Sequence, residues 1–202
     1  MTRRSGPERV AARRARLERH AAETDPAVVL NAAARFLESR SRSVDEVRRH
    51  LTVAAFPAPL VEGAIARLLE LGVLDDRAFA RAWVESRDRS RPRGEHALRH
   101  ELALKGVDRA TVEEVLVDRR DASAEAAPDD AGADSPAAER LLARRRAGLT
   151  RIADPRVRRG RAYALLARSG FAPDVCRDVS ARFVAASGSA DADTIDDVDI
   201  EP

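Results

Sequence analysis

The chain has 202 residues, of which 44% are hydrophobic and only 3% aromatic, a composition that favours packed helices over a β-sandwich. Its lone cysteine, Cys176, excludes an internal disulfide, and no apolar run approaches the roughly 20 residues of a membrane span, so we expect a cytoplasmic protein without a membrane partner. The net charge of +2 conceals blocks of opposite sign, which are +5 over residues 1–20, −5 over 121–137, +8 over 138–186 and −6 over 187–202.

A basic arm and a helical module are the first predicted elements. Residues 1–27 are rich in arginine and predict a basic N-terminal arm, either helical or frayed. Residues 28–72 predict three helices, because apolar residues recur there at helical spacing. The second of these helices begins at Ser43, which forms a capping box with Glu46: each side chain bonds the backbone N–H of the other. The third begins near Pro57, since proline is tolerated in a first turn.

A second module is predicted over residues 73–120. Its first helix opens with Asp75 as the N-cap and with Asp76 at the positive helix end. Adjacent aspartates could also suggest metal ligands, but no His or third acid stands at ligand spacing, so capping is the better interpretation. After a turn at residues 91–94, the next helix ends at Gly106.

A linker, a third module and a tail complete the predicted chain. Residues 121–137 are rich in Ala, Asp, Glu and Pro, and residues 187–202 carry six acids. Neither segment can bury enough apolar surface to order itself, so we predict an acidic disordered linker and an acidic disordered tail. Residues 138–186 repeat the apolar pattern of the earlier modules and predict the third helical module.

The modules repeat one another. The apolar pattern around Leu51 returns 51 residues later around Leu102, and after a further 64 residues around Leu166. Each copy contains a corner at which a left-handed residue precedes an apolar residue that folds back onto the helix. These corners are Ala55–Phe56, Gly106–Val107 and Gly170–Phe171. Because repeats of this length indicate stacked small units, the predicted fold is all-α, an elongated tandem array of three three-helix modules.

Catalytic and metal-binding motifs are not evident in the sequence. His96 and His100 share a helix face, but Ala97 stands where a zinc protease requires Glu, so a solvated face is the better interpretation. Cys176 occupies a position that is apolar in the other modules, which predicts a buried, inert thiol. Glycine-rich phosphate loops and nucleophile elbows are absent. We therefore predict a protein that is not an enzyme and that has no cofactor and no metal.

Clustered arginines are the candidate binding residues. They lie in the second and third modules and comprise Arg87, Arg89, Arg91, Arg93, Arg144, Arg145, Arg146, Arg156, Arg158, Arg159 and Arg161. Such clusters can neutralise phosphates or face an acidic protein surface, although a solvated face is the usual alternative. Aromatic residues interleave poorly with these arginines, so the stacking of single-stranded bases on them has little support.

One set of residues forms a longer pattern across the second module. It comprises Leu74-Asp75-Asp76, Phe79-Ala80, Trp83-Val84, Arg87, Gly94, Leu98, Glu101-Leu102 and Lys105-Gly106-Val107. This pattern resembles that of the RecX regulators of the RecA recombinase, and the first module fits it through Ser43, Glu46, Val47 and Leu51. The resemblance covers residues 28–186, is weak in the third module and leaves out the insertion at 121–135. Arginine also stands where family members often have lysine.

The resemblance implies an all-helical protein that binds in the groove of RecA–single-stranded DNA filaments. Such proteins limit filament extension or promote disassembly, and so lower ATPase and strand-exchange activity in recombination, DNA repair and the SOS response. The arginines would supply attraction to the filament, and basic faces could also contact single- or double-stranded DNA. We expect a monomer.

A helix-turn-helix-like DNA-binding regulator is the alternative, suggested by the helix–glycine–helix corners and the arginine clusters. The helices after Gly106 and Gly170 contain no Asn or Gln, which disfavours sequence-specific readout of bases.

Overall fold

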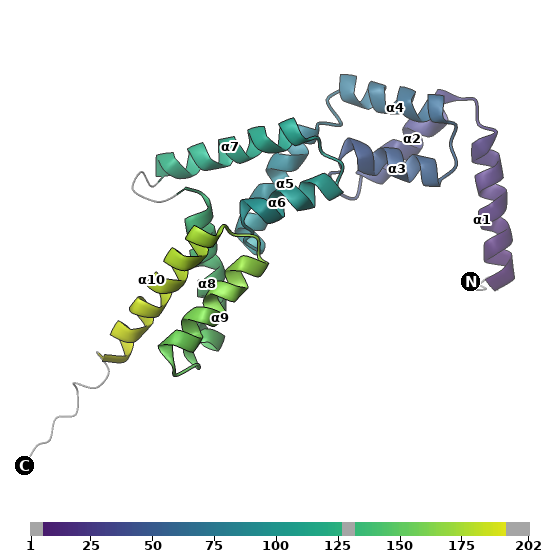
Figure 1. Cartoon of the computed structure of the whole chain (residues 1–202). Helices are drawn as coiled ribbons and strands as arrows, with labels where there is room; N and C mark the ends of the chain where they lie inside the picture. The colour runs from purple at the N-terminus through teal and green to yellow at the C-terminus, as the bar shows by residue number, and fades with distance from the viewer. Residues whose placement is uncertain (1–5, 127–131, 193–202) are drawn as a thin grey trace, which may run out of the picture. The chain divides into compact units, whose positions relative to one another are not determined.

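The computed structural model describes residues 6–126 and 132–192, and within these ranges all of the regular structure is α-helical (Figure 1). This confirms the predicted fold class. The helices in chain order are α1 (Gly6–Ala21), α2 (Pro26–Leu37), α3 (Val44–Val53), α4 (Ala58–Glu70), α5 (Asp76–Ser90), α6 (Glu95–Leu104), α7 (Arg109–Ala126), α8 (Asp134–Thr150), α9 (Pro155–Arg168) and α10 (Pro173–Ala192). None of these described helices is both long enough and apolar enough to cross a bilayer.

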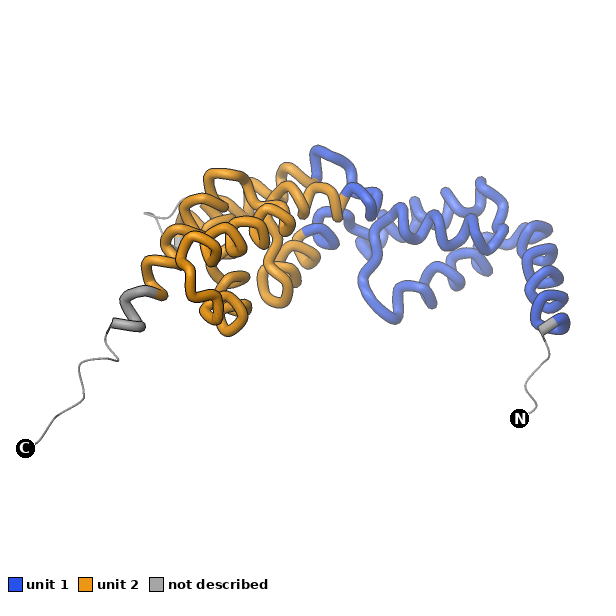
Figure 2. Tube along the Cα trace, turned by 60° about the horizontal axis from the view of Figure 1, so that its bottom comes forward, with its two compact units in different colours: residues 1–80, 103–111 blue, residues 81–102, 112–202 orange. Residues whose placement is uncertain are grey.

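Two compact units make up the chain (Figure 2). Unit 1 comprises residues 1–80 and 103–111, and unit 2 comprises residues 81–102 and 112–202. The predicted second module, residues 73–120, is divided between them. The division into three modules therefore stays a proposal, and each unit is described here by itself.

The core of unit 1 lies where α2, α3 and α4 pack on one another. Val29, Val47 and Leu51 are fully buried there, at the apolar positions that the sequence pattern indicated. The capping box at the start of α3 is confirmed: Ser43 Oγ accepts from the Glu46 N–H at 3.2 Å, and the Glu46 carboxylate accepts from the Ser43 N–H at 3.4 Å.

In unit 2, helices α8, α9 and α10 pack around a core of their own. Leu142, Leu166 and Val179 are buried in this core. Cys176 is also fully buried, as predicted, and its thiol donates to the Phe171 carbonyl at 3.5 Å. Burial raises the pKa of the Cys176 thiol, which disfavours the reactive thiolate.

The predicted helix corners are present in both units. Ala55, Gly106 and Gly170 have φ angles of 68°, 78° and 83°. After two of them, the apolar residue donates its N–H to the carbonyl of the residue five positions earlier: Phe56 to the Leu51 carbonyl, and Phe171 to the Leu166 carbonyl, each at 3.3 Å. These are the bonds of the Schellman motif.

In each unit, an aspartate at the start of one helix accepts a hydrogen bond from the first N–H of another helix. We call this contact a joint, and the sequence did not indicate it. In unit 1, the Val44 N–H at the start of α3 donates to Asp76 Oδ1, at the start of α5, at 2.9 Å. In unit 2, the Glu95 N–H at the start of α6 donates to Asp134 Oδ2, at the start of α8, at 3.1 Å. Each aspartate therefore satisfies a free N-terminal amide of a helix to which it does not belong.

Close backbone approach accompanies each joint. In unit 1, Ser43 Oγ donates to the Lys105 carbonyl at 2.5 Å, and in unit 2 the Gly94 N–H donates to the Ser169 carbonyl at 3.1 Å. A Cβ atom placed on Gly94 would lie 2.2 Å from the Gly170 carbonyl oxygen. The joint in unit 2 therefore requires glycine at this position.

Helix α9 begins differently from α3 and α6. Its N-cap is Asp154, whose carboxylate accepts from the Arg156 N–H of the same helix at 2.8 Å. Pro155 stands first in the helix, at the position that Val44 holds in α3 and Glu95 in α6. Proline has no N–H to donate.

Parts of the segments predicted to be disordered are helical. Residues 121–126 continue α7, and α8 already begins at Asp134, so the predicted linker was wrong at both of its ends. The physical reason is burial: Ser135 is 2% exposed and Ala137 is fully buried, which the acidic composition did not indicate. The linker residues 127–131 lie outside the described part.

The tail and the arm also contain helix. Residues 187–192 end α10, and the Ser187 side chain is buried at 4% exposure, so the predicted tail was wrong in this first part. Residues 193–202 lie outside the described part. In the arm, residues 6–21 form α1, the helical one of the two forms that the sequence allowed.

Candidate functional site

Unit 2 contains a cleft of about 510 Å³ that gathers arginines from the second and third predicted modules. Arg91 and Arg93 line it from the turn after α5, and Arg144 and Arg145 line it from α8. We call it the basic cleft. Leu141 and Leu165 are among its other lining residues, and no Asp or Glu lines it. Two clusters separated in the sequence thus form one cationic surface.

The α5–α6 turn fixes the shape of the basic cleft. Pro92 is fully buried in this turn, and the Gly94 N–H holds the turn against the Ser169 carbonyl. The Arg144 guanidinium donates to the carbonyl groups of Arg89 and Ser90. These carbonyls lie at the C-terminal end of α5, where the helix carries partial negative charge.

Much of the positive charge of the basic cleft is available to a partner. Arg91 and Arg145 are exposed, and among the described residues neither forms an ion pair with a carboxylate. Arg93 is partly neutralised, because its Nε lies 3.5 Å from Glu101 Oε1. The arrangement can attract an anionic surface, since unpaired guanidinium groups are strong donors to carboxylates and phosphates.

Arg87 and Arg89 lie outside this lining. Arg87 donates to Glu101 Oε2 at 2.6 Å, and its guanidinium carbon lies 4.4 Å from the centre of the Trp83 ring. Trp83 Nε1 donates to the same carboxylate oxygen at 2.9 Å, so Arg87 belongs to a contact between α5 and α6. Arg89 is largely exposed and lies 3.9 Å from Glu85 one turn earlier.

Arg158 is the candidate that the structure contradicts. It is only 6% exposed, and its guanidinium donates to the Ile152 carbonyl at 2.9 Å and to the Ala153 carbonyl at 3.5 Å. The reason is helical periodicity: Arg158 stands four and eight residues before Ala162 and Leu166, which are core residues of α9. The apolar spacing in the sequence could have indicated this.

The remaining candidates are exposed but dispersed. Arg156, Arg159 and Arg161 lie on α9 outside the lining of the basic cleft. Arg146 lines a different hollow, of about 200 Å³, together with Phe183 of α10. The structure therefore brings four of the predicted arginines together in one cleft.

A buried ion-pair network, which the sequence did not indicate, connects α5, α7 and α8. The Arg119 side chain is only 7% exposed and donates to both carboxylate oxygens of Asp88 at 2.9 Å and to Asp134 Oδ1 at 2.7 Å. Asp134 also holds the joint with α6. Its place in an acidic, proline-containing stretch gave no signal of this role.

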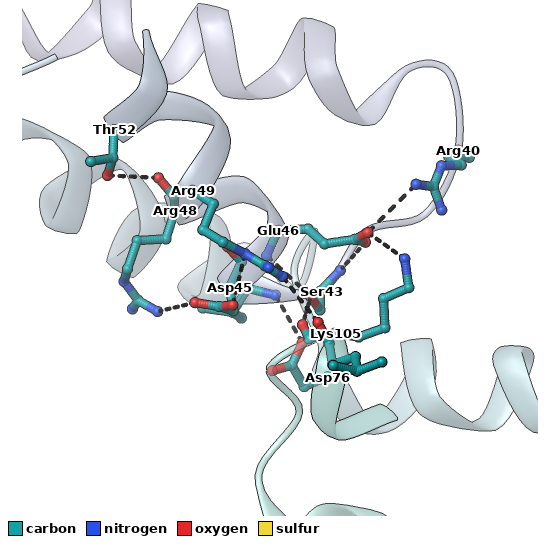
Figure 3. A network of polar contacts seen from close by, with 11 residues as sticks. Arg40, Ser43, Asp45, Glu46, Arg48, Arg49, Thr52, Asp76 and Lys105 are labelled. Carbon is teal, nitrogen blue, oxygen red and sulfur yellow. Dashed lines mark hydrogen bonds and ion pairs between the residues drawn. The ribbon is translucent and has the colours of Figure 1, made fainter. Parts of the chain in front are cut away.

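In unit 1, the corresponding joint is surrounded by charged side chains (Figure 3). Lys105 Nζ lies 2.7 Å from Glu46 Oε1, and Arg40 approaches the same carboxylate at 3.5 Å. Burial alone would raise the pKa of Glu46, but the hydrogen bond and charge of Lys105 hold that pKa below its ordinary value. These ion pairs stabilise the joint.

The described residues form no group of three or more His, Cys, Asp and Glu side chains that could hold a metal ion. His96 and His100 are both exposed on α6, which agrees with the solvated face that we predicted.

Comparison with known proteins connects these features to one family. Residues 75–116 match the second three-helix domain of RecX. The chain is 35% identical over 149 residues to the regulatory protein RecX of Mycobacterium sp. (strain JLS), which covers 72% of this chain and 75% of that protein. It is 33% identical over 145 residues to the RecX protein of Thermobifida fusca (strain YX), covering 72% of this chain and 70% of that protein.

Solved structures with a similar fold are also RecX proteins. The crystal structure of RecX from Lactobacillus salivarius superimposes with a TM-score of 0.63 at 20% identity, covering 80% of this chain and 97% of that one. A second RecX crystal structure gives a TM-score of 0.61 at 18% identity, covering 88% of this chain and 80% of that one. The identity and coverage of the curated relatives, together with the matched domain, show that the chain belongs to the RecX family of regulatory proteins.

Proposed function

We propose that this chain binds RecA–single-stranded DNA filaments in the cytoplasm and inhibits their ATPase and strand-exchange activities. Membership of the RecX family supports the regulatory role. The observation that supports a particular binding surface is the basic cleft. Its lining includes Arg91, Arg93, Arg144 and Arg145 and contains no acidic residue. A filament of protein and DNA phosphate presents the complementary negative charge.

The proposed action is regulatory rather than catalytic. Exposed arginines accelerate encounter with a negatively charged groove, and several weak contacts made by one chain add up to tight binding. A chain held in the groove would oppose further extension of the filament or promote its disassembly. No deep reactive pocket is needed for this action.

Titration of RecA's single-stranded-DNA-dependent ATPase with the full chain tests the proposal. We expect suppression at well below one chain per RecA. The variant R91E/R145E should raise the half-inhibitory concentration about tenfold or more, which corresponds to ~1.4 kcal/mol of binding free energy. The matched control R168E/R177E changes the same charge at exposed positions of unit 2 outside the basic cleft, and it should inhibit like the unaltered chain.

Two results would count against this function. Full inhibition by R91E/R145E at physiological salt would remove the basic cleft from the mechanism. No effect on the ATPase up to stoichiometric amounts, together with tight and steeply salt-dependent binding to bare duplex DNA, would favour the DNA-binding regulator instead.

A further inference from the structure

Unit 1 contains a second cleft, of about 640 Å³, to which α1, α2 and α3 contribute. We call it the ring cleft. Its chemistry comes from six of its lining residues: Arg16, His20, Asn31, Arg35, Phe36 and His50. None of the lining residues is acidic. The volume falls within the roughly 300–1,000 Å³ that is usual for small-ligand sites.

Flat rings form much of the wall of the ring cleft. The His50 imidazole is stacked on Phe36 with centroids 3.9 Å apart and planes 1° apart. The His20 imidazole is stacked on Phe56, which also lines the cleft, at 4.2 Å and 11°. Each phenyl ring is thus covered by an imidazole, and in each pair the imidazole is more exposed than the phenyl ring.

Hydrogen bonding and local charge fix the state of the two imidazoles. His20 Nδ1 lies 2.8 Å from the Ala54 carbonyl, which can only accept, so Nδ1 carries the proton. Burial, followed by the charges of Arg42 and Arg16, lowers the pKa of His50. His50 is therefore a neutral, planar ring at neutral pH, in a positive local potential.

Cationic and amide groups stand beside these rings. Arg16 and Arg35 are exposed, and among the described residues no carboxylate forms an ion pair with either. Asn31 is also an exposed lining residue, and its amide can both donate and accept. The Arg42 guanidinium carbon lies 4.2 Å from the centre of the Phe36 ring, which adds a further positive charge near the cleft.

We propose that the ring cleft binds one nucleotide unit, with the phosphate at Arg16 and Arg35 and the base against the imidazoles. Cations combined with stacking faces are the usual means of binding single-stranded nucleic acid. An acidic peptide would use the arginines but would leave the rings without a partner. The bases of a duplex are stacked on one another and cannot reach the rings.

This inference goes beyond the proposed function, since it concerns a site in unit 1 and needs no RecA. It also revises the sequence prediction that base stacking has little support. That prediction considered only the arginine clusters of the second and third modules. In unit 1, the rings come from α1, α2, α3 and the corner at Phe56, so that no short sequence window contains them together.

Fluorescence anisotropy of a labelled oligo(dT) with the full chain, measured without RecA over a range of salt concentrations, tests the proposal. We expect R16A/R35A to bind about tenfold or more weakly. The slope of log affinity against log salt should fall by about 0.7, since both arginines contact one phosphate and each phosphate contact to a single strand contributes roughly 0.7. The control R13A/R67A removes the same charge from exposed positions of unit 1 outside the ring cleft and should bind within about twofold.

A second variant separates stacking from charge. H50A removes a neutral ring at an exposed position, so it should weaken oligo(dT) binding about fivefold or more without changing the salt slope. Far-UV circular dichroism of each variant checks that the helices are retained. An affinity for oligo(dT) that is unchanged in both R16A/R35A and H50A would overturn the assignment.

Competition identifies the source of the nucleotide. Displacement of the oligo(dT) by unlabelled single strands but not by dTMP or ATP indicates a site for nucleotides within a strand. Displacement by free dTMP or ATP indicates a site for free nucleotides, which also supports the proposal. Equal displacement by polyglutamate, or tighter binding of duplex than of single-stranded DNA, would overturn it.

Discussion

Arginine has two separate roles in this chain, and exposure distinguishes them. Arg119 and Arg158 are buried and bind carboxylates or carbonyls of their own unit. Arg91 and Arg145 are exposed and are available to a partner. Sequence alone assigned Arg158 to the second group, because a run of arginines does not reveal which of them faces the core.

Removal of Arg119 should be costly. In R119A, the Asp88 and Asp134 carboxylates would lose their shared cation while remaining partly buried, so we expect a loss of about 3–5 kcal/mol in unfolding free energy, measured by urea denaturation. The control R182A breaks an exposed pair with Glu139 and should cost about 1 kcal/mol or less. Equal losses in the two variants would contradict the buried role of Arg119.

Asp76 provides a pH-dependent prediction. Burial raises its pKa, as do the nearby charges of Asp108, Asp75 and Asp45, so the folded chain binds this proton more tightly than the unfolded chain does. Ionisation of Asp76 therefore costs stability as the pH rises through its folded pKa. Asn at this position keeps the acceptor for the Val44 N–H and removes the charge.

We expect D76N to be at least as stable as the unaltered chain at pH 7. This gain should disappear once the pH falls below about 3.9, the ordinary pKa of Asp, because Asp76 is then protonated in both the folded and the unfolded chain. Thermal unfolding followed by circular dichroism across this pH range measures the effect. D76A leaves the Val44 N–H without its acceptor and should lose about 1–3 kcal/mol. A loss in D76N as large as that in D76A would refute this account.

At the scale of helices, the sequence predicted the helix caps and corners but not the joints between helices. The capping box at Ser43 and the corner at Gly170 were evident, because each depends on residues within six positions of one another. The start of α8 at Asp134 depends instead on Arg119 and on the Glu95 N–H, which are distant in the sequence. The basic cleft likewise depends on contacts between residues distant in the sequence. Its arginines were recognised as candidates, but their grouping in one cleft depends on how the helices pack.

Glycines at the unit 2 joint should be intolerant of alanine. G170A places a side chain at a φ of 83°, which costs roughly 1–2 kcal/mol, and its Cβ would lie 2.4 Å from Ala97 Cβ. The control G160A adds a methyl group within α9 where no atom lies within 4 Å, and it should gain up to about 1 kcal/mol. Urea denaturation measures both. A stable G170A would show that the joint can open without cost.

For the whole chain, the two clefts belong to different units and share no lining residue. The basic cleft has arginines without open aromatic faces, whereas the ring cleft combines arginines with imidazole and phenyl rings. Their chemistry therefore favours different partners, an acidic filament for one and a nucleotide for the other.

The two activities should consequently be separable. R91E/R145E should lose inhibition of the RecA ATPase but bind oligo(dT) normally, whereas R16A/R35A should show the reverse. Because the sites share no partners, the effects of combining both pairs should be additive within about 0.5 kcal/mol. Loss of both activities in either double variant, with helicity retained, would show that one surface serves both.

Pro155 has a consequence for the contacts that the start of α9 can make. The joint within each unit depends on a free amide at the first position of a helix, which Val44 supplies in α3 and Glu95 in α6. Pro155 has no amide hydrogen, and Asp154 is already engaged by its own helix. A carboxylate placed beside the start of α9 would therefore find no N–H at the first helical position, and a joint of the kind seen at α3 and α6 could not form there.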